Sequence, residues 1–195
     1  HRTSPCIVGG RFLGSNSECV WYGVSCNLTG QIFRIDFEEN SLVGSIASEL
    51  GSLVGLTSLA LEKGDLEGTI PSTFGQLSKL ETLDLDYNRL SGDIPPEIVG
   101  AQALKMIDLN DNKLSGGLRY LSQLNNLERL WIHSNVLVGP VPSSFGNIPR
   151  LCKYKMMRSL PRTVPTYFAA PSRCLTSARL FLLLSSHYCF SLFFF

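Results

Sequence analysis

The stretch LETLDLDYNRLSGDIPPEI, from Leu80 to Ile98, determines how this chain folds. Its first part alternates leucine with polar residues, which is the period of a strand buried on one face. Asn88 then marks a turn, Gly92 suits a bend with positive φ or a close backbone approach, and Pro95 fits an outer edge segment. The same columns recur on both sides of this stretch, so the chain is a tandem repeat.

Six repeats align at a spacing of 23 or 24 residues, with starts at Ile32, Leu56, Leu80, Leu104, Leu127 and Leu151. In the first five, apolar residues recur at positions +3, +5, +10 and +14, and glycine recurs at +12. Asparagine stands at +8 except where Gly64 replaces it. One repeat cannot bury its own apolar face, so stacked repeats should share a core beneath a parallel sheet, with the asparagines bonded to backbone groups at the turns.

This pattern resembles the plant-type leucine-rich repeat, L-x-x-L-x-L-x-x-N-x-L-x-G-x-I-P. The resemblance implies an α/β repeat fold, a right-handed solenoid of five to six repeats with a parallel sheet on its concave face. We assign residues 1–30 to a truncated N-terminal cap, 31–150 to the repeats, 151–168 to a degraded sixth repeat and 169–195 to an apolar, basic tail. Because the first residue is His1 and not Met, we also expect a fragment or a processed product.

The segment Cys19-Val-Trp21-Tyr-Gly23-Val24-Ser-Cys26 is similar to the C-x-W-x-G-V-x-C end of the cap in extracellular members of this family. The resemblance implies a Cys19–Cys26 disulfide; the alternative is two free thiols in a cytosolic protein. Asn27-Leu28-Thr29 is a glycosylation sequon, which predicts a glycan on Asn27. Both features suit a secreted or cell-surface protein.

Charge divides the 195-residue chain into two parts. Residues 1–150 hold all 16 acidic and 11 of the 17 basic residues, a net of −5, whereas residues 151–195 hold six basic residues and no acid. The 44% of hydrophobic residues excludes disorder across the whole chain. The apolar end, from Leu180 to Phe195, has three interpretations: a membrane anchor, which would give membrane association, a cleaved lipid-anchor signal, or a translated intron or shifted frame. We favour the last, because it also explains the missing acids.

The concave face should carry the function. Its outward strand residues, at +2, +4, +6 and +7, include eight acids and three basic residues in twenty positions. We predict a binding surface for a protein or peptide with a basic surface, or for a cell-wall glycan, against the alternative of a merely soluble face. Nucleic acid is disfavoured, since its phosphates would meet negative charge. The candidate binding residues are Asp36, Glu38, Glu62, Asp84, Asp86, Tyr87, Asp108, Asp111, Arg129, Trp131 and His133.

Catalysis is not expected. His133, Ser134 and Asp108 or Asp111 could be drawn as a triad, but an open sheet offers no oxyanion pocket and excludes no water. We predict no metal and no cofactor, because no phosphate-binding loop occurs and the loop spacing of a calcium site is absent. The resemblance implies extracellular recognition. The alternatives are a piece of a receptor kinase ectodomain in membrane signalling and a secreted inhibitor of hydrolases.

Overall fold

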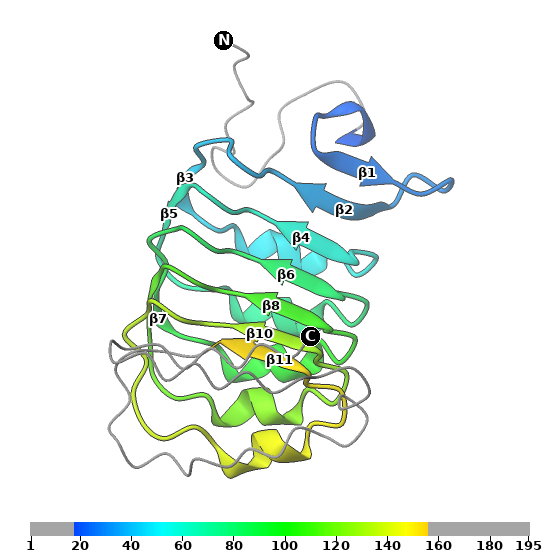
Figure 1. The fold of residues 1–195 in the computed structure, drawn as a ribbon. Coiled ribbons are helices and arrows are strands. Elements are labelled where there is room, and N and C mark those ends of the chain that lie inside the picture. Colours follow the sequence, from blue (N-terminus) through cyan, green and yellow to red (C-terminus); the bar gives the residue numbers. More distant parts are fainter. Residues whose placement is uncertain (1–17, 156–195) are drawn as a thin grey trace, which may run out of the picture.

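In a computed structural model, which describes residues 18–155, each repeat adds one strand to a seven-stranded sheet (Figure 1). The strand order is β1-β2-β4-β6-β8-β10-β11, with β1 antiparallel to β2 and every later pair parallel. The predicted parallel sheet of a leucine-rich-repeat solenoid is therefore confirmed. Its strands are β1 Val24–Cys26, β2 Ile32–Asp36, β4 Ser58–Ala60, β6 Thr82–Asp84, β8 Met106–Asp108, β10 Arg129–Trp131 and β11 Lys153–Lys155.

Strand β11 lies at the start of the predicted sixth repeat. It pairs in register with β10, Arg129 opposite Lys153 and Trp131 opposite Lys155, as the 24-residue spacing requires. Residues 1–17 of the cap, the rest of the sixth repeat and the tail of 169–195 lie outside the described residues.

Short helices and a second set of strands complete each turn of the solenoid. The helices η2 to η6 cover the other side of the core from the seven-stranded sheet (Figure 1). All are 3-10 helices: η1 Glu18–Val20, η2 Ser48–Ser52, η3 Ser72–Gln76, η4 Pro96–Gly100, η5 Arg119–Gln123 and η6 Ser143–Asn147. Strands β3 Val43–Ser45 and β5 Asp65–Glu67 form one small sheet, and β7 Ser91–Asp93 and β9 Lys113–Ser115 form another.

Proline sets where these helices begin. Pro71, Pro95 and Pro142 each occupy the N-cap position with φ near −60°, which the pyrrolidine ring fixes in advance. The fourth repeat lacks this proline and is one residue shorter. Its helix η5 follows Leu118 directly and so begins one position earlier in the repeat. This earlier start accommodates the repeat that is one residue shorter.

The core consists of the repeated apolar columns. Leu59, Leu83, Ile107 and Leu130, at +3 on successive strands, are at most 1% exposed. The +10 and +14 leucines and isoleucines close the core behind the sheet, and Phe74, Ile98, Leu121 and Phe145 add one side chain from each helix. Burying a side chain of this size contributes about 1.5–3 kcal/mol, so the repeated columns supply most of the driving force for folding.

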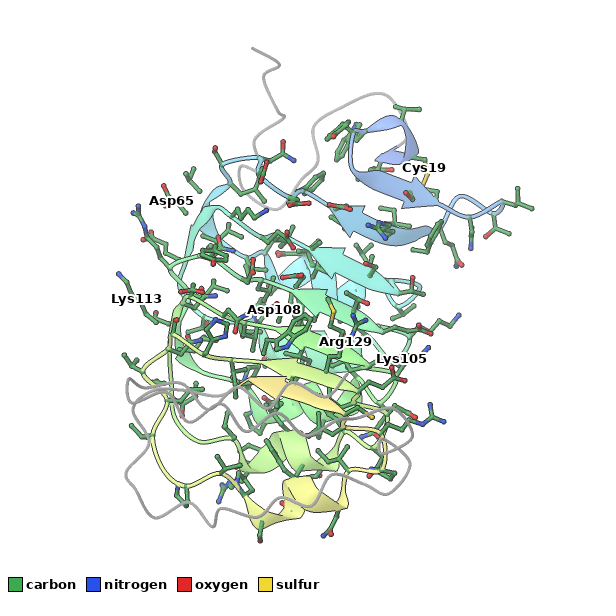
Figure 2. The ribbon with its side chains drawn as sticks, viewed as in Figure 1. Cys19, Asp65, Lys105, Asp108, Lys113 and Arg129 are labelled. Atoms are coloured by element: carbon green, nitrogen blue, oxygen red, sulfur yellow. A yellow bond between two sulfur atoms is a disulfide. The ribbon has the colours of Figure 1, made fainter. Side chains whose placement is uncertain are left out.

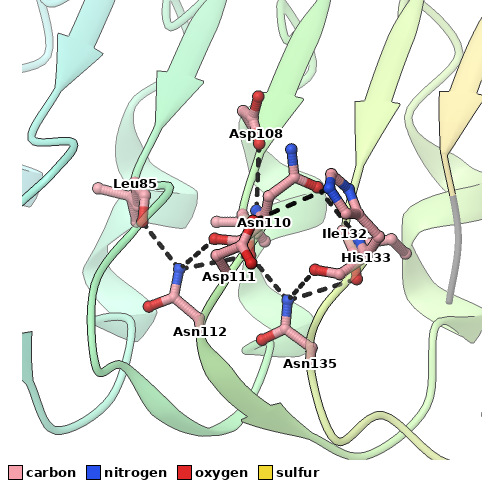
Figure 3. Close-up of polar contacts among 9 residues, drawn as sticks. Leu85, Asp108, Asn110, Asp111, Asn112, Ile132, His133 and Asn135 are labelled. Atoms are coloured by element: carbon pink, nitrogen blue, oxygen red, sulfur yellow. Dashed lines mark hydrogen bonds and ion pairs between the residues drawn. The ribbon is translucent and has the colours of Figure 1, made fainter. Parts of the chain in front are cut away.

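The +8 asparagines form a continuous hydrogen-bonded ladder, which we call the asparagine ladder: Asn88, Asn112 and Asn135. Asn112 Nδ2 donates to the carbonyl oxygens of Leu85 (2.9 Å), Leu109 (3.3 Å) and Asn110 (3.0 Å) (Figure 3). Its Oδ1 accepts from Leu90 N at 2.9 Å. Asn88 and Asn135 repeat this arrangement one turn away. The ladder joins adjacent repeats through buried backbone groups, and it satisfies the N–H groups of Leu66, Leu90 and Leu114.

The +12 glycines have φ between 73° and 92°, which confirms the positive φ predicted for them. Six residues that are not glycine also have positive φ, between 48° and 55°. Ser41 stands at +9, and the other five stand at +7: Glu39, Lys63, Tyr87, Asp111 and Ser134. The sequence analysis placed this column on the strands, and that was wrong. The strands of the middle repeats end at +4, so the +6 and +7 side chains project from the turn that follows.

Candidate functional site

The outward side chains of the seven-stranded sheet and of the turns after its strands form one surface. Asp108 and Arg129 lie over this sheet, whereas Asp65 and Lys113 lie along the edge formed by the small sheets (Figure 2). The parallel register sets Asp84 beside Asp108 and Ala60 beside Asp84. Side chains 24 residues apart therefore become neighbours across the strands.

Four acids on this surface form what we call the carboxylate stripe: Glu62, Asp84, Asp86 and Asp108. One carboxylate oxygen from each of Glu62, Asp84 and Asp86 lies within 4.8 Å of the others. The three side chains are half-buried, and Asp86 Oδ1 is buried without a hydrogen-bond partner. Asp108 is only 6% exposed, and its Oδ1 accepts from Asn110 N at 3.1 Å. The stripe thus concentrates negative charge where little water reaches it.

The burial of the stripe favours the protonated form of each carboxyl group. Burial raises the pKa of Glu62 to about 8, and a hydrogen bond to Asp84 and repulsion from that carboxylate add to the effect. Burial likewise raises the pKa of Asp108 to about 7 and the pKa of Asp84 and of Asp86 to about 6. Near neutral pH the stripe therefore shares protons among its carboxyl groups, and its charge depends on pH.

The acids at the N-terminal end of the surface are paired differently. Arg34 Nη2 lies 2.6 Å from Asp36 Oδ2, and Lys63 Nζ lies 2.6 Å from Glu38 Oε1 and 3.0 Å from Glu39 Oε1. The hydrogen bond from Lys63 lowers the pKa of Glu38. Lys63 is 3.9 Å from Glu62, so its charge mainly compensates the two nearer glutamates and not the stripe.

Aromatic and basic groups lie toward the C-terminal end of the surface. The Arg129 guanidinium carbon is 5.9 Å from the centre of the Trp131 ring, within the range of a cation–π contact. Tyr87 is 55% exposed on its turn. His133 Nε2 lies 3.8 Å from Asp111 Oδ2. The sheet thus brings all eleven candidate residues onto one surface, with the stripe in the middle.

Two details of this surface differ from the sequence analysis. Asp108 was expected to face solvent, but it is buried, with Trp131 as its register partner on the next strand. Asn110 was not a candidate, yet it is 7% exposed and its Oδ1 accepts from His133 N at 3.1 Å (Figure 3). The break in the acidic +6 column at Asn110 was the available signal, since a buried amide can bond a neighbouring strand without adding charge.

The cap closes the N-terminal end of the core and borders the surface. A disulfide joins Cys19 and Cys26, with 5.5 Å between their Cα atoms. A hollow of about 500 Å³ lies between the cap and β2, and its lining includes Tyr22, Arg34, Asp36 and Glu38. Its walls are mostly polar, so it extends the charged surface and is not an apolar ligand pocket.

The site offers little for chemistry. Glu62, Asp84 and Asp86 could together give three oxygen ligands to a cation, fewer than the six to eight that calcium takes. Ser134, the nucleophile of the imagined triad, stands exposed on a left-handed turn beside His133. The geometry gives no support for enzyme activity in residues 18–155. In that same part of the chain, no helix has both the length and the apolar character to cross a membrane.

Comparison with known proteins agrees with this architecture. Two family models described as leucine-rich repeat match residues 54–114 and 126–148. A probable LRR receptor-like serine/threonine-protein kinase of Arabidopsis thaliana is 44% identical over 43 residues, which are 22% of this chain and 6% of the kinase. The chain therefore spans only a small part of that relative.

Two solved structures from Arabidopsis thaliana match over most of both chains. The LRR ectodomain of the receptor kinase SOBIR1 is 33% identical with a TM-score of 0.69, and the match covers 76% of this chain and 88% of that one. A chain of the BIR3–SERK2 complex is 34% identical with a TM-score of 0.66, over 78% of this chain and 85% of that one. The chain therefore belongs to the leucine-rich repeat family, in which its structural neighbours include plant receptor ectodomains.

Proposed function

We propose that this chain is a non-catalytic extracellular recognition module that binds a protein or peptide with a basic surface on its concave face. The carboxylate stripe carries the proposal. Four neighbouring acids, three half-buried and Asp108 buried, cost stability, and a cationic group of a partner would relieve their repulsion. The exposed Tyr87 and the half-buried Trp131 add aromatic surface beside the stripe, which is typical of residues that anchor a partner.

The comparisons favour one biological setting for this module. SOBIR1 is a receptor kinase, and BIR3 and SERK2 form a complex in which one chain is similar to this one. We therefore place the module in the ectodomain of a receptor-like kinase, where it would act in membrane signalling from the cell surface. A secreted inhibitor of hydrolases is the alternative, but no feature of residues 18–155 favours it over the receptor.

A displayed random-peptide library selected on the immobilised full chain would test the proposal. We expect the selected peptides to be enriched in lysine and arginine. Replacing Asp84, Asp86 and Asp108 with lysine should then reduce the affinity of the best peptide at least about tenfold, mostly through slower association at low salt. Selected peptides without cationic enrichment, or equal affinity for the lysine variant, would contradict the proposal.

Two controls separate binding from folding. Changing Glu49, Glu67 and Glu97 to lysine alters the net charge equally, but these exposed acids lie on the helices and the small sheet. This variant should bind as the wild type does. Changing Asp84, Asp86 and Asp108 to asparagine keeps the size of each side chain, so a loss of binding in that folded variant would be a charge effect.

A further inference from the structure

The turn between β1 and β2 is the most exposed part of the cap. Residues 27–31 are all exposed, and the turn projects beyond the sheet on the side away from β3 and β5 (Figure 1). Gly30, at φ 79°, closes the turn, and its N donates to the carbonyl oxygen of Asn27 at 3.0 Å. Asn27 N in turn donates to the carbonyl oxygen of Gln31 at 2.9 Å. The backbone is therefore well defined while the side chains face solvent.

The Asn27 carboxamide is held in one orientation by the residues that follow it. Its Oδ1 accepts from Thr29 Oγ1 at 2.7 Å, from Thr29 N at 3.0 Å and from Gln31 N at 3.0 Å. These three donors fix the oxygen toward the turn, so the nitrogen faces outward. Nδ2 makes a single long contact, 3.4 Å to Oε1 of the exposed Gln31 side chain, which can move away.

We propose that Asn27 is N-glycosylated. Asn27 Nδ2 forms a bond to the anomeric carbon of the first sugar of a lipid diphosphate-linked oligosaccharide. The bond between that carbon and the diphosphate oxygen breaks, the lipid diphosphate leaves, and Nδ2 loses one proton. The hydroxyl group two residues on, which the acceptor sequence requires, is already in contact with the carboxamide.

Two further observations support a glycan at this turn. Leu28, the middle residue of the sequon, is fully exposed, and the first sugars attached beside it would cover this apolar side chain. The disulfide of the same cap indicates an oxidising compartment, in which this modification takes place. Asn27 precedes the first residue of β2, whereas the carboxylate stripe lies at the ends of the strands and in the turns that follow, so the glycan would leave the recognition surface open.

The modification can be tested on the full chain, placed behind a cleavable signal sequence and translated with microsomes. An amidase that removes the glycan leaves Asp in place of Asn27, which mass spectrometry of the tryptic peptide 12–34 detects. The wild type should show this conversion. Sugar transfer occurs on the entering chain, and the contacts that orient Asn27 come only from residues 29–31, so they do not require the rest of the fold. An unmodified Asn27 in microsomes that glycosylate a control protein would overturn the proposal.

Paired variants identify the site. Thr29→Ser keeps the hydroxyl and should keep the glycan, whereas Thr29→Ala should lose it. Leu28→Ala should remain modified, whereas Leu28→Pro should not, because proline at this position blocks the acceptor. A glycan that persists in Thr29→Ala or Leu28→Pro would show that Asn27 is not the acceptor.

Discussion

The asparagine ladder and the carboxylate stripe run side by side through the repeats as two polar ladders. They have opposite effects on stability. The asparagine ladder gives each buried amide three or four backbone partners, as Asn112 shows. The carboxylate stripe, two to four residues earlier in each repeat, packs like charges together and leaves Asp86 Oδ1 without a partner. Both ladders are largely removed from water. The supply of hydrogen-bond donors, and not burial itself, decides which one stabilises the fold.

The difference suggests that each repeat has one part that stabilises the backbone and another that forms the recognition surface. The asparagine ladder fixes the turn that carries the +6 and +7 residues, including Tyr87 at φ 48°. A left-handed residue with a side chain costs about 1–2 kcal/mol, so this turn needs external support. The ladder thus stabilises the backbone on which the strained and charged recognition surface stands.

The largest expected effect is the loss of one ladder asparagine. Asn112→Ala would remove the partner of Leu90 N and one of two donors to each of the carbonyl oxygens of Leu85, Leu109 and Asn110. Because an unsatisfied buried N–H costs about 1–3 kcal/mol and three further hydrogen bonds are lost, we expect the free energy of unfolding to fall by about 3 kcal/mol. Urea denaturation would measure it.

A neighbouring asparagine provides the control for this change. Asn125 is exposed, so Asn125→Ala should change the free energy of unfolding by less than about 0.5 kcal/mol. If the two variants lost similar amounts, the asparagine ladder would not be the stabilising element we describe.

The second effect is the pH dependence that the carboxylate stripe imposes. In the unfolded chain these acids titrate near pH 4, whereas the native pKa values are about 8 for Glu62, about 7 for Asp108 and about 6 for Asp84 and Asp86. Between these limits the native state binds more protons than the unfolded state. The free energy of unfolding should therefore fall as the pH rises from 5 to 8, by about 2 kcal/mol after allowance for solvent screening.

Neutralising the stripe should remove most of this dependence. A variant with Glu62→Gln and with asparagine at positions 84, 86 and 108 keeps the side-chain shapes but cannot titrate there. Its urea midpoint should change less between pH 5 and pH 8 than that of the wild type, and it should be the more stable protein at pH 8. A wild-type curve that rises with pH over this range would refute the description of the stripe.

The third effect is smaller and concerns the missing member of the asparagine ladder. Gly64→Asn would place an acceptor near Leu42 N, as the other ladder members do for the residue at +10 of the preceding repeat. An added Cβ would lie 3.0 Å from Leu42 O and from Asn88 Oδ1, so the turn must shift by a few tenths of an ångström. We expect a net gain of about 1 kcal/mol.

Gly64→Ala separates the two contributions to that change. It introduces the close Cβ contacts without the hydrogen bonds, so it should be less stable than Gly64→Asn by more than about 1 kcal/mol in thermal or urea unfolding. Equal stability of the two variants would mean that the restored amide makes no ladder bond.

The two ladders also differ in how far the sequence predicts them. The asparagine ladder follows from the +8 column, because a periodic asparagine at a turn has few other roles, and the buried columns follow from period-two leucines. The burial of Asp108 and the positive φ of Tyr87 do not follow from the sequence. The burial of Asp108 depends on the next repeat, where Trp131 is its register partner. The φ of Tyr87 depends on the asparagine ladder. Both also depend on where each strand ends. The candidate residues of the surface could thus be named, but their exposure, charge state and pairing could not.

The smallest expected effect comes from an ion pair at the edge of the sheet. Lys105 Nζ lies 2.7 Å from Glu81 Oε2, as short as the contact between Lys63 and Glu38, and both side chains are nearly half exposed. Water and salt screen such a pair, and holding two long side chains together costs entropy. Lys105→Gln should therefore lower the free energy of unfolding by less than about 0.5 kcal/mol, and this small loss should vanish at high salt. A larger loss of unfolding free energy that persisted at high salt would mean that distance alone predicts the strength of polar contacts on this solenoid. The contrast between the asparagine ladder and the carboxylate stripe would then need another cause.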